Sequence, residues 1–302
     1  MSIIQTEAYA MRLKNQEELL KSSSGGAFTA LSDEFLKKGD AVVCTVYNYE
    51  KKEAEFRLVT NTEGRNAARG SKYMQSNPGD IFRECVKWLC EYPQKKMLFI
   101  GTGCQAAGFQ SFISQHRLEE RVLVVDIICH GVPSPRIWKE YEQQLERIHN
   151  GSITDLTFKD KRNGWLKPTA IVKINENEIP IKNYTRIFYS KLALRPSCYK
   201  CPYTTVERKV DITIGDFWHI EKRLPELYHA MGTSLVLIHT DKGKNFFLSI
   251  QNGLECREVR IEECMQDNLQ RPTAKPSKRV HFWKDYHAKG IGYIIKNMEM
   301  FH

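Results

Sequence analysis

The spacing of apolar side chains predicts a short α+β region at the start of the chain. Residues 27–36 carry apolar side chains at three- and four-residue intervals, which predicts a helix directly after the Ser/Gly-rich segment 22–26. Residues 1–22 are rich in charge and are also expected to be helical. Residues 41–47 and 54–60 alternate between apolar and polar positions, which indicates two antiparallel strands.

A strand–helix alternation follows. Short apolar runs at 97–100 and 122–129 each precede a segment of helical spacing, at 105–114 and 136–148, and another helix is expected over 80–92. Strands that alternate with helices are typical of a parallel sheet flanked by those helices. The sequence therefore predicts an α/β arrangement in this part of the chain.

The pattern changes again after residue 151. The remaining expected elements are strands at 153–158, 169–174, 211–214 and 234–239 and helices at 242–250 and 282–300. Together the elements predict a small N-terminal α+β module (residues 1–95), a larger α/β module with a mixed, partly parallel sheet (96–270) and a C-terminal helical tail (271–302).

Composition narrows the class of protein. The chain has 302 residues, of which 41% are hydrophobic and 27% charged, as in a globular protein with a substantial core. It contains no run near the roughly 20 apolar residues that a membrane helix needs, and no signal peptide. We therefore expect a cytoplasmic protein without a membrane span.

The net charge of +9 raises the question of an acidic partner. The basic residues are spread along the chain, and no nucleic-acid-binding motif accompanies them. We therefore expect no nucleic-acid partner. The charge fits either a solvated surface or a docking face for an acidic protein.

Nine cysteines are many for a reducing compartment, where structural disulfides are disfavoured. Cys198 and Cys201 are separated by two residues and followed by Pro202, a spacing that lets two sulfurs reach one metal centre. The pair by itself is compatible with zinc, an iron–sulfur cluster, a redox dithiol or no ligand role.

Cys104 and Cys129 extend this pair to a set of four. Each lies at the carboxyl end of a predicted parallel strand, the edge where ligands bind in open α/β sheets. Four cysteines are the usual ligand number for a cubane cluster, although a strand-end cysteine is also common as core filler. The other five, which we interpret as core or surface residues, are Cys44, Cys85, Cys90, Cys256 and Cys264.

Two further segments are candidate anion sites. The segment 22–26 precedes a predicted helix, whose N-terminal N–H groups and dipole favour a phosphate, although Ser and Gly there are also ordinary caps. Arg69 and Lys72 flank Gly70 and Ser71. They could hold a flavin pyrophosphate or stabilise a reduced flavin ring, or they could form a surface turn.

Six short motifs, taken in order, resemble the coenzyme F-420 hydrogenase/dehydrogenase beta-subunit family. They are Ser24-Gly25-Gly26-Ala27, Gly70-Ser71-Lys72-Tyr73, Gly101-Thr102-Gly103-Cys104-Gln105, Cys129-His130-Gly131-Val132-Pro133-Ser134, Cys198-Tyr199-Lys200-Cys201 and Asp211-Ile212-Thr213-Ile214-Gly215-Asp216-Phe217-Trp218. The resemblance runs from about residue 22 to residue 250, most of the chain.

The resemblance implies two cofactors, FAD and a 4Fe-4S cluster. The cluster ligands it implies are Cys104, Cys129, Cys198 and Cys201. The cofactor contacts it implies are Ser24, Gly25, Gly26, Gly70, Ser71, Lys72, Tyr73 and Thr102. The activity expected from it is a flavin- and iron–sulfur-dependent oxidoreductase that couples hydride transfer at FAD to one-electron transfer through the cluster.

Three features depart from the family pattern. Gly103 stands where the family turn usually has Pro, and His219 stands where Gly is usual. No cysteine precedes Cys44, so the closely spaced cysteines of the N-terminal ferredoxin module found in many relatives are absent. The expected partners are therefore a ferredoxin or a separate electron-transfer subunit, together with a small-molecule substrate that could be coenzyme F-420, sugar-linked or of another kind.

A zinc-stabilised, cysteine-rich binding module without redox activity is the alternative. It would use the same four cysteines and the basic surface, because zinc is redox-silent and binds four thiolates. The sequence singles out no catalytic side chain. It also leaves open the direction of electron flow, the oligomeric state and whether both cofactors are retained, since a family member can keep the fold and lose a cofactor.

Overall fold

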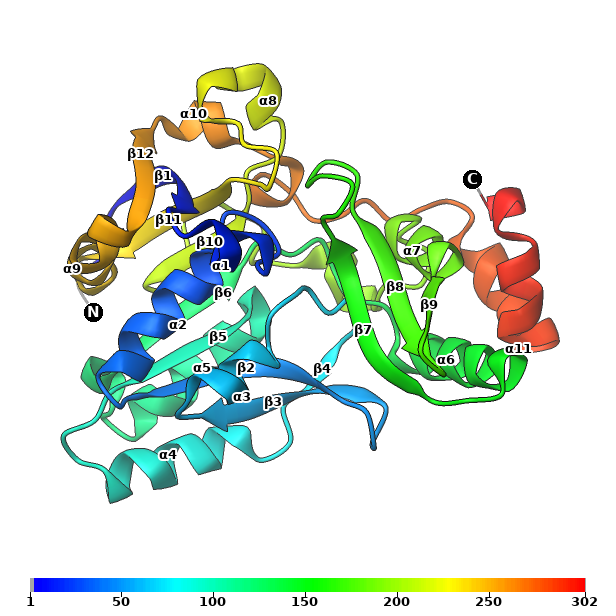
Figure 1. Cartoon of the computed structure of the whole chain (residues 1–302), viewed down its shortest axis with the longest axis horizontal. Coiled ribbons are helices and arrows are strands. Elements are labelled where there is room, and N and C mark those ends of the chain that lie inside the picture. The colour runs from blue at the N-terminus through cyan, green and yellow to red at the C-terminus, as the bar shows by residue number, and fades with distance from the viewer. Residues whose placement is uncertain (1–2, 302) are drawn as a thin grey trace.

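The computed structural model describes residues 3–301 and contains two β-sheets. The larger is a nine-stranded sheet in the order β12-β1-β11-β10-β6-β5-β2-β3-β4, on the left in Figure 1. Its strands are β1 (Ile3–Leu13), β2 (Ala41–Asn48), β3 (Glu53–Val59), β4 (Ser76–Asn77), β5 (Met97–Thr102), β6 (Val122–Ile127), β10 (Ile212–Asp216), β11 (Ser234–Thr240) and β12 (Leu254–Val259).

The centre of this sheet is parallel and its flanks are mostly antiparallel. Strands β2, β5, β6 and β10 pair in parallel, as the strand–helix alternation predicted. Strand β3 runs antiparallel to β2, and β11 runs antiparallel to β10 and to β1. The expectation of an α/β fold with a mixed, partly parallel sheet is therefore confirmed.

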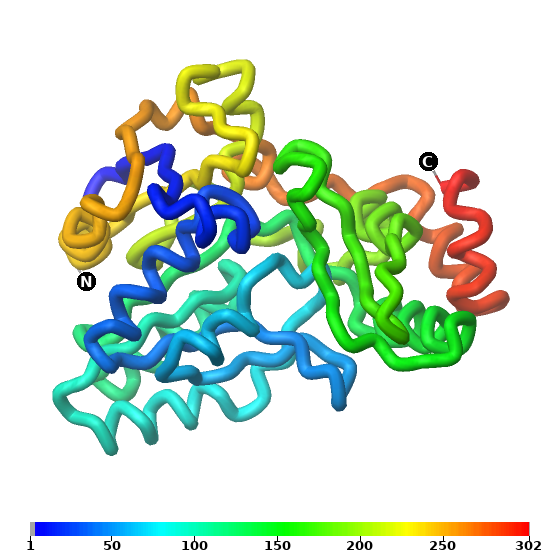
Figure 2. The backbone as a smooth tube through the Cα atoms, in the orientation of Figure 1, coloured from blue at the N-terminus to red at the C-terminus, as the bar shows by residue number. Residues whose placement is uncertain are grey.

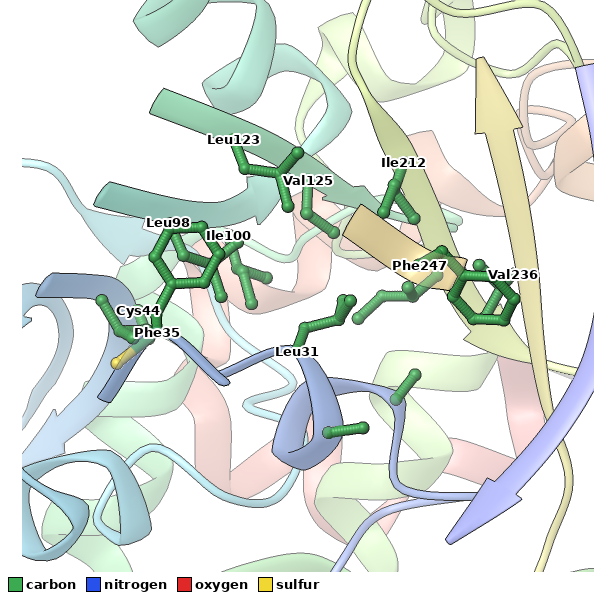
Figure 3. Close-up of a cluster of buried hydrophobic side chains, with 14 of the residues drawn as sticks. Leu31, Phe35, Cys44, Leu98, Ile100, Leu123, Val125, Ile212, Val236 and Phe247 are labelled. Atoms are coloured by element: carbon green, nitrogen blue, oxygen red, sulfur yellow. The ribbon is translucent and has the colours of Figure 1, made fainter. Parts of the chain in front are cut away.

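Helices cover both faces of the sheet. Helices α2 (Ala27–Lys37) and α9 (Asp241–Ile250) pack on one face, and α4 (Ile81–Glu91) and α5 (Gly103–Gln115) on the other. Successive strand residues point to opposite faces, so each central strand contributes to both cores. Figure 3 shows the first of these cores, in which Leu31 and Phe35 of α2 face side chains of β5 and β6.

The smaller sheet belongs to a second lobe, on the right in Figure 1 and in the backbone tube of Figure 2. It is an antiparallel meander of β7 (Ile153–Asp160), β8 (Thr169–Ile174) and β9 (Asn177–Pro180). Three helices pack with it around Trp138, Tyr184 and Phe282: α6 (Pro135–His149), α7 (Lys182–Tyr189) and α11 (Arg279–Lys296).

The remaining described elements are short. They include α1 (Gln16–Leu20), α3 (Thr62–Asn66), α8 (Ile220–Arg223), α10 (Ile261–Cys264) and the 3₁₀ turn η2 (Pro196–Lys200). The helix expected over 282–300 begins earlier, at Arg279, and is interrupted at Gly290, which has φ 75° and ψ 177°.

The expectation of a helix over residues 1–22 is wrong for the described part of that segment. Residues Ile3–Leu13 form strand β1, which lies between β11 and β12, and only Gln16–Leu20 are helical. Pairing with strands from the far end of the chain overrides the local helical propensity, which is a weak preference by comparison.

The helices described here are all too short or too polar to be membrane spans. Between residues 3 and 301, no helix has the length and apolar character needed to cross a bilayer.

Candidate functional site

A cavity of about 580 Å³ opens at the carboxyl ends of β5, β6 and β10, beside the N-terminus of α2. Its volume is in the range of small-molecule and cofactor pockets, roughly 300–1,000 Å³. The predicted cofactor contacts that line it are Ser24, Gly26, Gly70, Ser71, Lys72, Tyr73 and Thr102. The chain thus brings three distant segments to one cavity.

Gly25 is the predicted cofactor contact that does not line the cavity. A Cβ atom at this position would lie 2.2 Å from the carbonyl oxygen of Met11 and 2.5 Å from the backbone nitrogen of Ser234. Gly25 therefore allows the loop to pack directly on the backbones of β1 and β11. Within the described chain, Gly25 therefore contacts other parts of the protein rather than the cavity.

The Ser/Gly segment 22–26 forms the turn that starts α2. Gly26 occupies the N-cap position with φ 89°, a conformation that glycine adopts without strain. The hydroxyl of Ser24 donates to the carbonyl of Thr233 at 3.0 Å, so it already has a partner. Among the residues described, no side chain caps α2, and its first-turn N–H groups are available to an anion in the cavity.

Lys72 places a cation at the cavity wall. Its Nζ atom donates to the carbonyls of Ala68, Arg69 and Gly70 at 2.7, 2.8 and 3.1 Å. Burial lowers the pKa of Lys72 to about 8. These three partners are carbonyl dipoles rather than a carboxylate, so the site retains a positive charge that an anionic ligand would neutralise.

An aromatic wall follows directly after Lys72. The ring of Tyr73 stacks on Phe188 with centroids 4.1 Å apart and an interplanar angle of 5°. Tyr189 donates to the Tyr73 hydroxyl at 2.9 Å, and Tyr184 donates to the Tyr73 carbonyl at 2.7 Å. These contacts fix the Tyr73 ring, because both its face and its hydroxyl are engaged.

The four predicted cluster cysteines lie near one another, and one of them lines the cavity. We call this part of the cavity the cysteine end and the part around Ser24 and Lys72 the Ser/Gly end. Cys129 lines the cavity, and burial raises the pKa of its thiol to about 12, with smaller contributions from the thiols of Cys198, Cys104 and Cys201. Cys201 also interacts with Cys104 and Cys198 in the same way. Cys104 is exposed, whereas the other three are partly buried.

Two hydrogen bonds reach these sulfurs. The backbone N–H of Gly131 donates to the sulfur of Cys129 at 3.3 Å, and the Thr102 hydroxyl lies 3.3 Å from the sulfur of Cys104. Gly131 has φ 122°, and a Cβ there would lie 3.0 Å from the Cβ of Cys198. Glycine at this position therefore allows the loop of Cys129 to approach the loop of Cys198.

The thiols are close, but they do not form a site for a single ion. In residues 3–301, no group of three or more His, Cys, Asp or Glu side chains is arranged to hold one metal ion. A cubane cluster makes a different demand, because each of its four thiolates binds a different iron atom. The donor set of four thiols, one of which accepts from a backbone N–H, fits that demand chemically.

The five other cysteines lie apart from this group. Cys44, Cys85 and Cys264 are buried, Cys256 is partly buried and Cys90 is exposed. Cys44 nevertheless lines the cavity, and burial raises the pKa of its thiol to about 12. It is therefore a neutral, apolar part of the wall near Lys72.

Sequence reasoning missed two polar side chains of the wall. Both ring nitrogens of His130 and the Oε1 atom of Gln266 are buried, and none of the three has a hydrogen-bond partner in the described part of the chain. Burial lowers the pKa of His130 to about 4, so its ring is neutral at physiological pH. The sequence could have pointed to His130, because it directly follows Cys129 in a motif. No sequence pattern pointed to Gln266.

The motif Asp216-Phe217-Trp218 contributes two residues to the cavity wall, Asp216 and Trp218. Asp216 accepts from Lys159 at 2.5 Å and from the indole of Trp165 at 3.1 Å. His219, one of the departures noted above, also lines the cavity and has φ 69°. A left-handed conformation explains why glycine would suit this position.

A cavity that joins a glycine-rich turn, a partly buried cation and the thiol of Cys129 is suited to a cofactor-dependent redox protein. Two family models, both described as coenzyme F420 hydrogenase/dehydrogenase, beta subunit, match the chain: the N-terminal model over residues 8–80 and the C-terminal model over residues 94–263. The chain therefore belongs to the coenzyme F420 hydrogenase/dehydrogenase beta-subunit family, a family of oxidoreductases associated with redox cofactors and electron transfer.

A solved structure has a similar fold. It is a chain of the F420-reducing [NiFe] hydrogenase complex from Methanosarcina barkeri, with 18% sequence identity and a TM-score of 0.54. The similarity covers 99% of the present chain and 92% of that chain. No curated protein sequence matches the chain significantly.

Proposed function

We propose that this protein is a FAD- and 4Fe-4S-dependent oxidoreductase that exchanges hydride with a small organic molecule and passes single electrons to or from a protein partner. The observation that carries the proposal is that one cavity is lined both by the segments around Ser24 and Lys72 and by Cys129. The thiol of Cys129 interacts in turn with the three other candidate cluster ligands. Flavin and cluster would therefore be neighbours.

The flavin would be held at the Ser/Gly end. The first turn of α2 offers N–H groups to a pyrophosphate, with Gly26 giving the close backbone approach. Lys72 and the loop of Gly70 and Ser71 add a positive charge, and Tyr73 forms an apolar wall for a flat ring. Thr102 would contact the flavin on the side nearest the cysteines.

Cys104, Cys129, Cys198 and Cys201 would hold the cluster. When bound, FAD supplies hydride and single-electron transfer and the cluster supplies single-electron transfer. The chain positions the two, excludes water from the buried side of Cys129, and adjusts the potentials through hydrogen bonds to sulfur.

The organic substrate is proposed as a small hydride donor or acceptor. Coenzyme F420, which the family's description names, is one candidate, and a sugar-linked compound is another. No catalytic side chain is assigned, because hydride transfer to a flavin needs positioning more than proton transfer by the protein.

The electron partner is proposed to be a ferredoxin or a separate subunit. The similar chain from Methanosarcina barkeri comes from a hydrogenase complex. The loop of Cys198 and Cys201 is bordered by the exposed cations Arg195 and Lys200, and the whole chain carries +9. Opposite charge on a small redox protein would favour its encounter with this loop.

In this proposal the modules have different roles. Residues 1–95 would supply most flavin contacts and 96–270 would supply the cluster ligands, while helix α11 of the tail 271–302 packs on α6. Strands of the first two segments share the nine-stranded sheet, so the boundary remains a proposal about function.

The test is purification without oxygen, followed by visible spectroscopy and measurement of iron, flavin and zinc per chain. Flavin and iron–sulfur absorption with about four irons per chain, as expected for a cubane, would support the proposal. A colourless protein with one zinc per chain would instead support the cysteine-rich binding module.

A further inference from the structure

A second cavity, of about 560 Å³, lies outside the candidate functional site. Among residues 3–301, no residue lines both cavities. One part of its wall is the segment 193–196, which leads into the loop of Cys198, and another is the beginning of α11 with Arg279 and Trp283. The other wall residues are Gln75, Ser134 and Pro135. The cavity therefore lies where the loop of Cys198 meets the C-terminal tail.

Direct contacts join this second cavity to the loop of Cys198. The backbone N–H of Cys198 donates to the carbonyl of Arg195 at 3.0 Å. The guanidinium carbon of Arg279 lies 5.2 Å from the ring centroid of Tyr199, the residue that follows Cys198. The Tyr199 hydroxyl donates in turn to the carbonyl of Lys191 at 2.5 Å. A protein that contacts Arg195 and Arg279 would therefore also lie against the loop that carries Cys198.

Arg279 is held in place but only partly used. Its guanidinium carbon also lies 5.2 Å from the ring centroid of Trp283, so aromatic rings flank it on two sides. Its Nη1 atom donates to the carbonyl of Leu192, which the Trp283 indole also reaches at 3.2 Å. Its Nε and Nη2 atoms have no partner within residues 3–301 and are not buried, so they are available to a ligand.

The cations around the second cavity have no carboxylate partner in the described chain. Arg195, Lys200 and Arg279 take part in no ion pair within residues 3–301, whereas Lys289, also on α11, pairs with a carboxylate at 3.0 Å. The tail 271–302 has seven Lys and Arg residues and two acidic ones, so it carries +5 of the net charge of +9. Positive charge that the chain does not balance favours an acidic partner.

Apolar side chains accompany these cations. Val280, the neighbour of Arg279, is 74% exposed, more than any other large apolar residue described. Trp283 lies one turn further along α11, and residues three or four apart on a helix are neighbours on its surface. Tryptophan and arginine are enriched among the residues that carry most of the binding energy of protein interfaces. The surface therefore suits a protein partner better than a free anion.

We propose that the second cavity and the adjoining face of α11 are the docking site for an acidic electron-transfer protein, and that a carboxylate side chain of this partner binds Arg279. The inference rests on the proposed function, because it requires an exchange of electrons with a separate protein. Arg279 offers Nε and Nη2 as a pair of donors, which suits the two oxygens of a carboxylate. Val280 and Trp283 supply the apolar contact. The partner then lies against the loop of Cys198.

The test is isothermal titration calorimetry at low salt between the purified holoprotein and an acidic two-cluster bacterial ferredoxin, with iron and flavin measured in every sample. Arg279→Gln should weaken binding about tenfold, because the carboxylate loses its charged pair of donors. Arg279→Lys keeps the charge but not the paired donors, and a smaller loss is expected. Val280→Asp should weaken binding severalfold without a change in the fold, because this exposed position would then repel an acidic partner.

Lys296→Gln is the matched control. Lys296 is an exposed cation at the end of α11 that does not line the second cavity, and its replacement changes the net charge by the same amount. Its affinity for ferredoxin should equal that of the wild type. A loss as large as that of Arg279→Gln would show that only the overall charge matters and would overturn the docking site.

Inorganic phosphate tests whether the second cavity is instead a site for small anions. If phosphate binds the wild type but not Arg279→Gln, while ferredoxin binds both equally, the docking inference is overturned. Wild-type affinity in cofactor-replete Arg279→Gln and Val280→Asp, or no ferredoxin binding by the cofactor-replete wild type, would also overturn it and leave the cofactor assignment intact. Wild-type protein that binds neither flavin nor iron under anaerobic conditions would overturn the proposed function, and the inference with it.

Discussion

The two ends of the cavity differ in how their polar groups find partners. At the Ser/Gly end, Ser24 and Lys72 bond to backbone carbonyls of the chain itself, with shortest distances of 3.0 and 2.7 Å. At the cysteine end, four thiols lie near one another and both ring nitrogens of His130 are without a partner among the described residues. The polar groups of the Ser/Gly end therefore already have partners within the chain, whereas the cysteine end has donors and acceptors that an occupant would satisfy.

The difference has an energetic meaning. Preformed contacts keep their geometry when a ligand leaves, so flavin loss should change the fold little. Metal binding to thiols supplies folding free energy, because the unfolded chain rarely holds the ligands together in a site. The following predictions separate the two ends.

The largest expected effect is at the cysteine end. Cys198→Ala or Cys201→Ala should remove most of the iron, because a cubane iron loses its only protein thiolate at that corner. The measurement is iron per chain after anaerobic purification. Cys90→Ala is the control, since Cys90 is exposed on α4 and away from the group. Wild-type iron in both Cys198 and Cys201 variants would contradict the ligand assignment.

Gly25→Ala should destabilise the protein by about 1–3 kcal/mol, as overpacking does in a tight site. The added Cβ would lie 2.2 Å from a backbone oxygen of β1, which cannot move without shifting the strand. The measurement is the free energy of unfolding in denaturant. Gly253→Ala is matched to it, because nothing lies within 4 Å of the added Cβ there. Equal stability of the two variants would show that the loop at Gly25 is not tightly packed.

Lys72→Met should weaken flavin retention about tenfold, or about 1.4 kcal/mol, by removing a charge and a donor at the Ser/Gly end. It should also shift the flavin potential downward, because the anionic reduced ring loses a nearby cation. Lys95→Met is the control: Lys95 likewise donates to a carbonyl, that of Lys38 at 2.8 Å, but it does not line the cavity. Equal flavin affinity and potential in both variants would exclude Lys72 as a flavin contact.

The pH dependence of flavin retention should report the same lysine. The pKa of Lys72 is lowered to about 8, so its cation is present below that pH and is lost as pH rises through it. An anionic flavin group binds the cation, so retention should be strongest below pH 8 and weaken above it. Equilibrium dialysis against free FAD measures this. The Lys72→Met variant should show no step near pH 8, and an unchanged step there would assign it to another group.

The smallest expected effect is on the rate of electron transfer at the exposed loop that contains Arg195 and Lys200. Reduction by a reduced ferredoxin should slow severalfold as salt is raised, because Arg195 and Lys200 attract an acidic partner only within a screening length of about 8–10 Å. Stopped-flow absorbance measures the rate. A neutral reductant is the control and should be indifferent to salt. If ferredoxin is equally indifferent, the docking is not electrostatic.

The periodicity of apolar residues was sufficient to predict the positions of those helices and strands that have a strong local pattern. Helices α2, α5 and α6 and the parallel strands beside them lie close to the predicted ranges, because each buries one regular apolar face. Strand β1 was missed because its pairing partners are β11 and β12, and nothing local in Ile3–Leu13 reveals them.

The candidate site likewise contains residues that the sequence pointed to and residues that it did not. The loops around Gly26, Gly70 and Cys104 stood out because their motifs occur together and in the order of the family, although each has an ordinary structural explanation by itself, and their cofactor roles remain predictions. Gln266 could not be predicted, because it is an ordinary residue type in a loop with no pattern that only the fold brings to the cavity. The second cavity, beside Arg279, was missed for the same reason, since its wall comes from segments that lie far apart in the sequence.

The position of β1 has a consequence for how the protein is made. The strand is synthesised well before both of its neighbours, β11 and β12, which follow the rest of the large sheet in the sequence. Until then its N–H and C=O groups lack the partners they have in the finished sheet, and chains with such distant pairings fold slowly. During synthesis, β1 therefore waits a long time for its partners, and an unpaired strand in that interval is a template for aggregation.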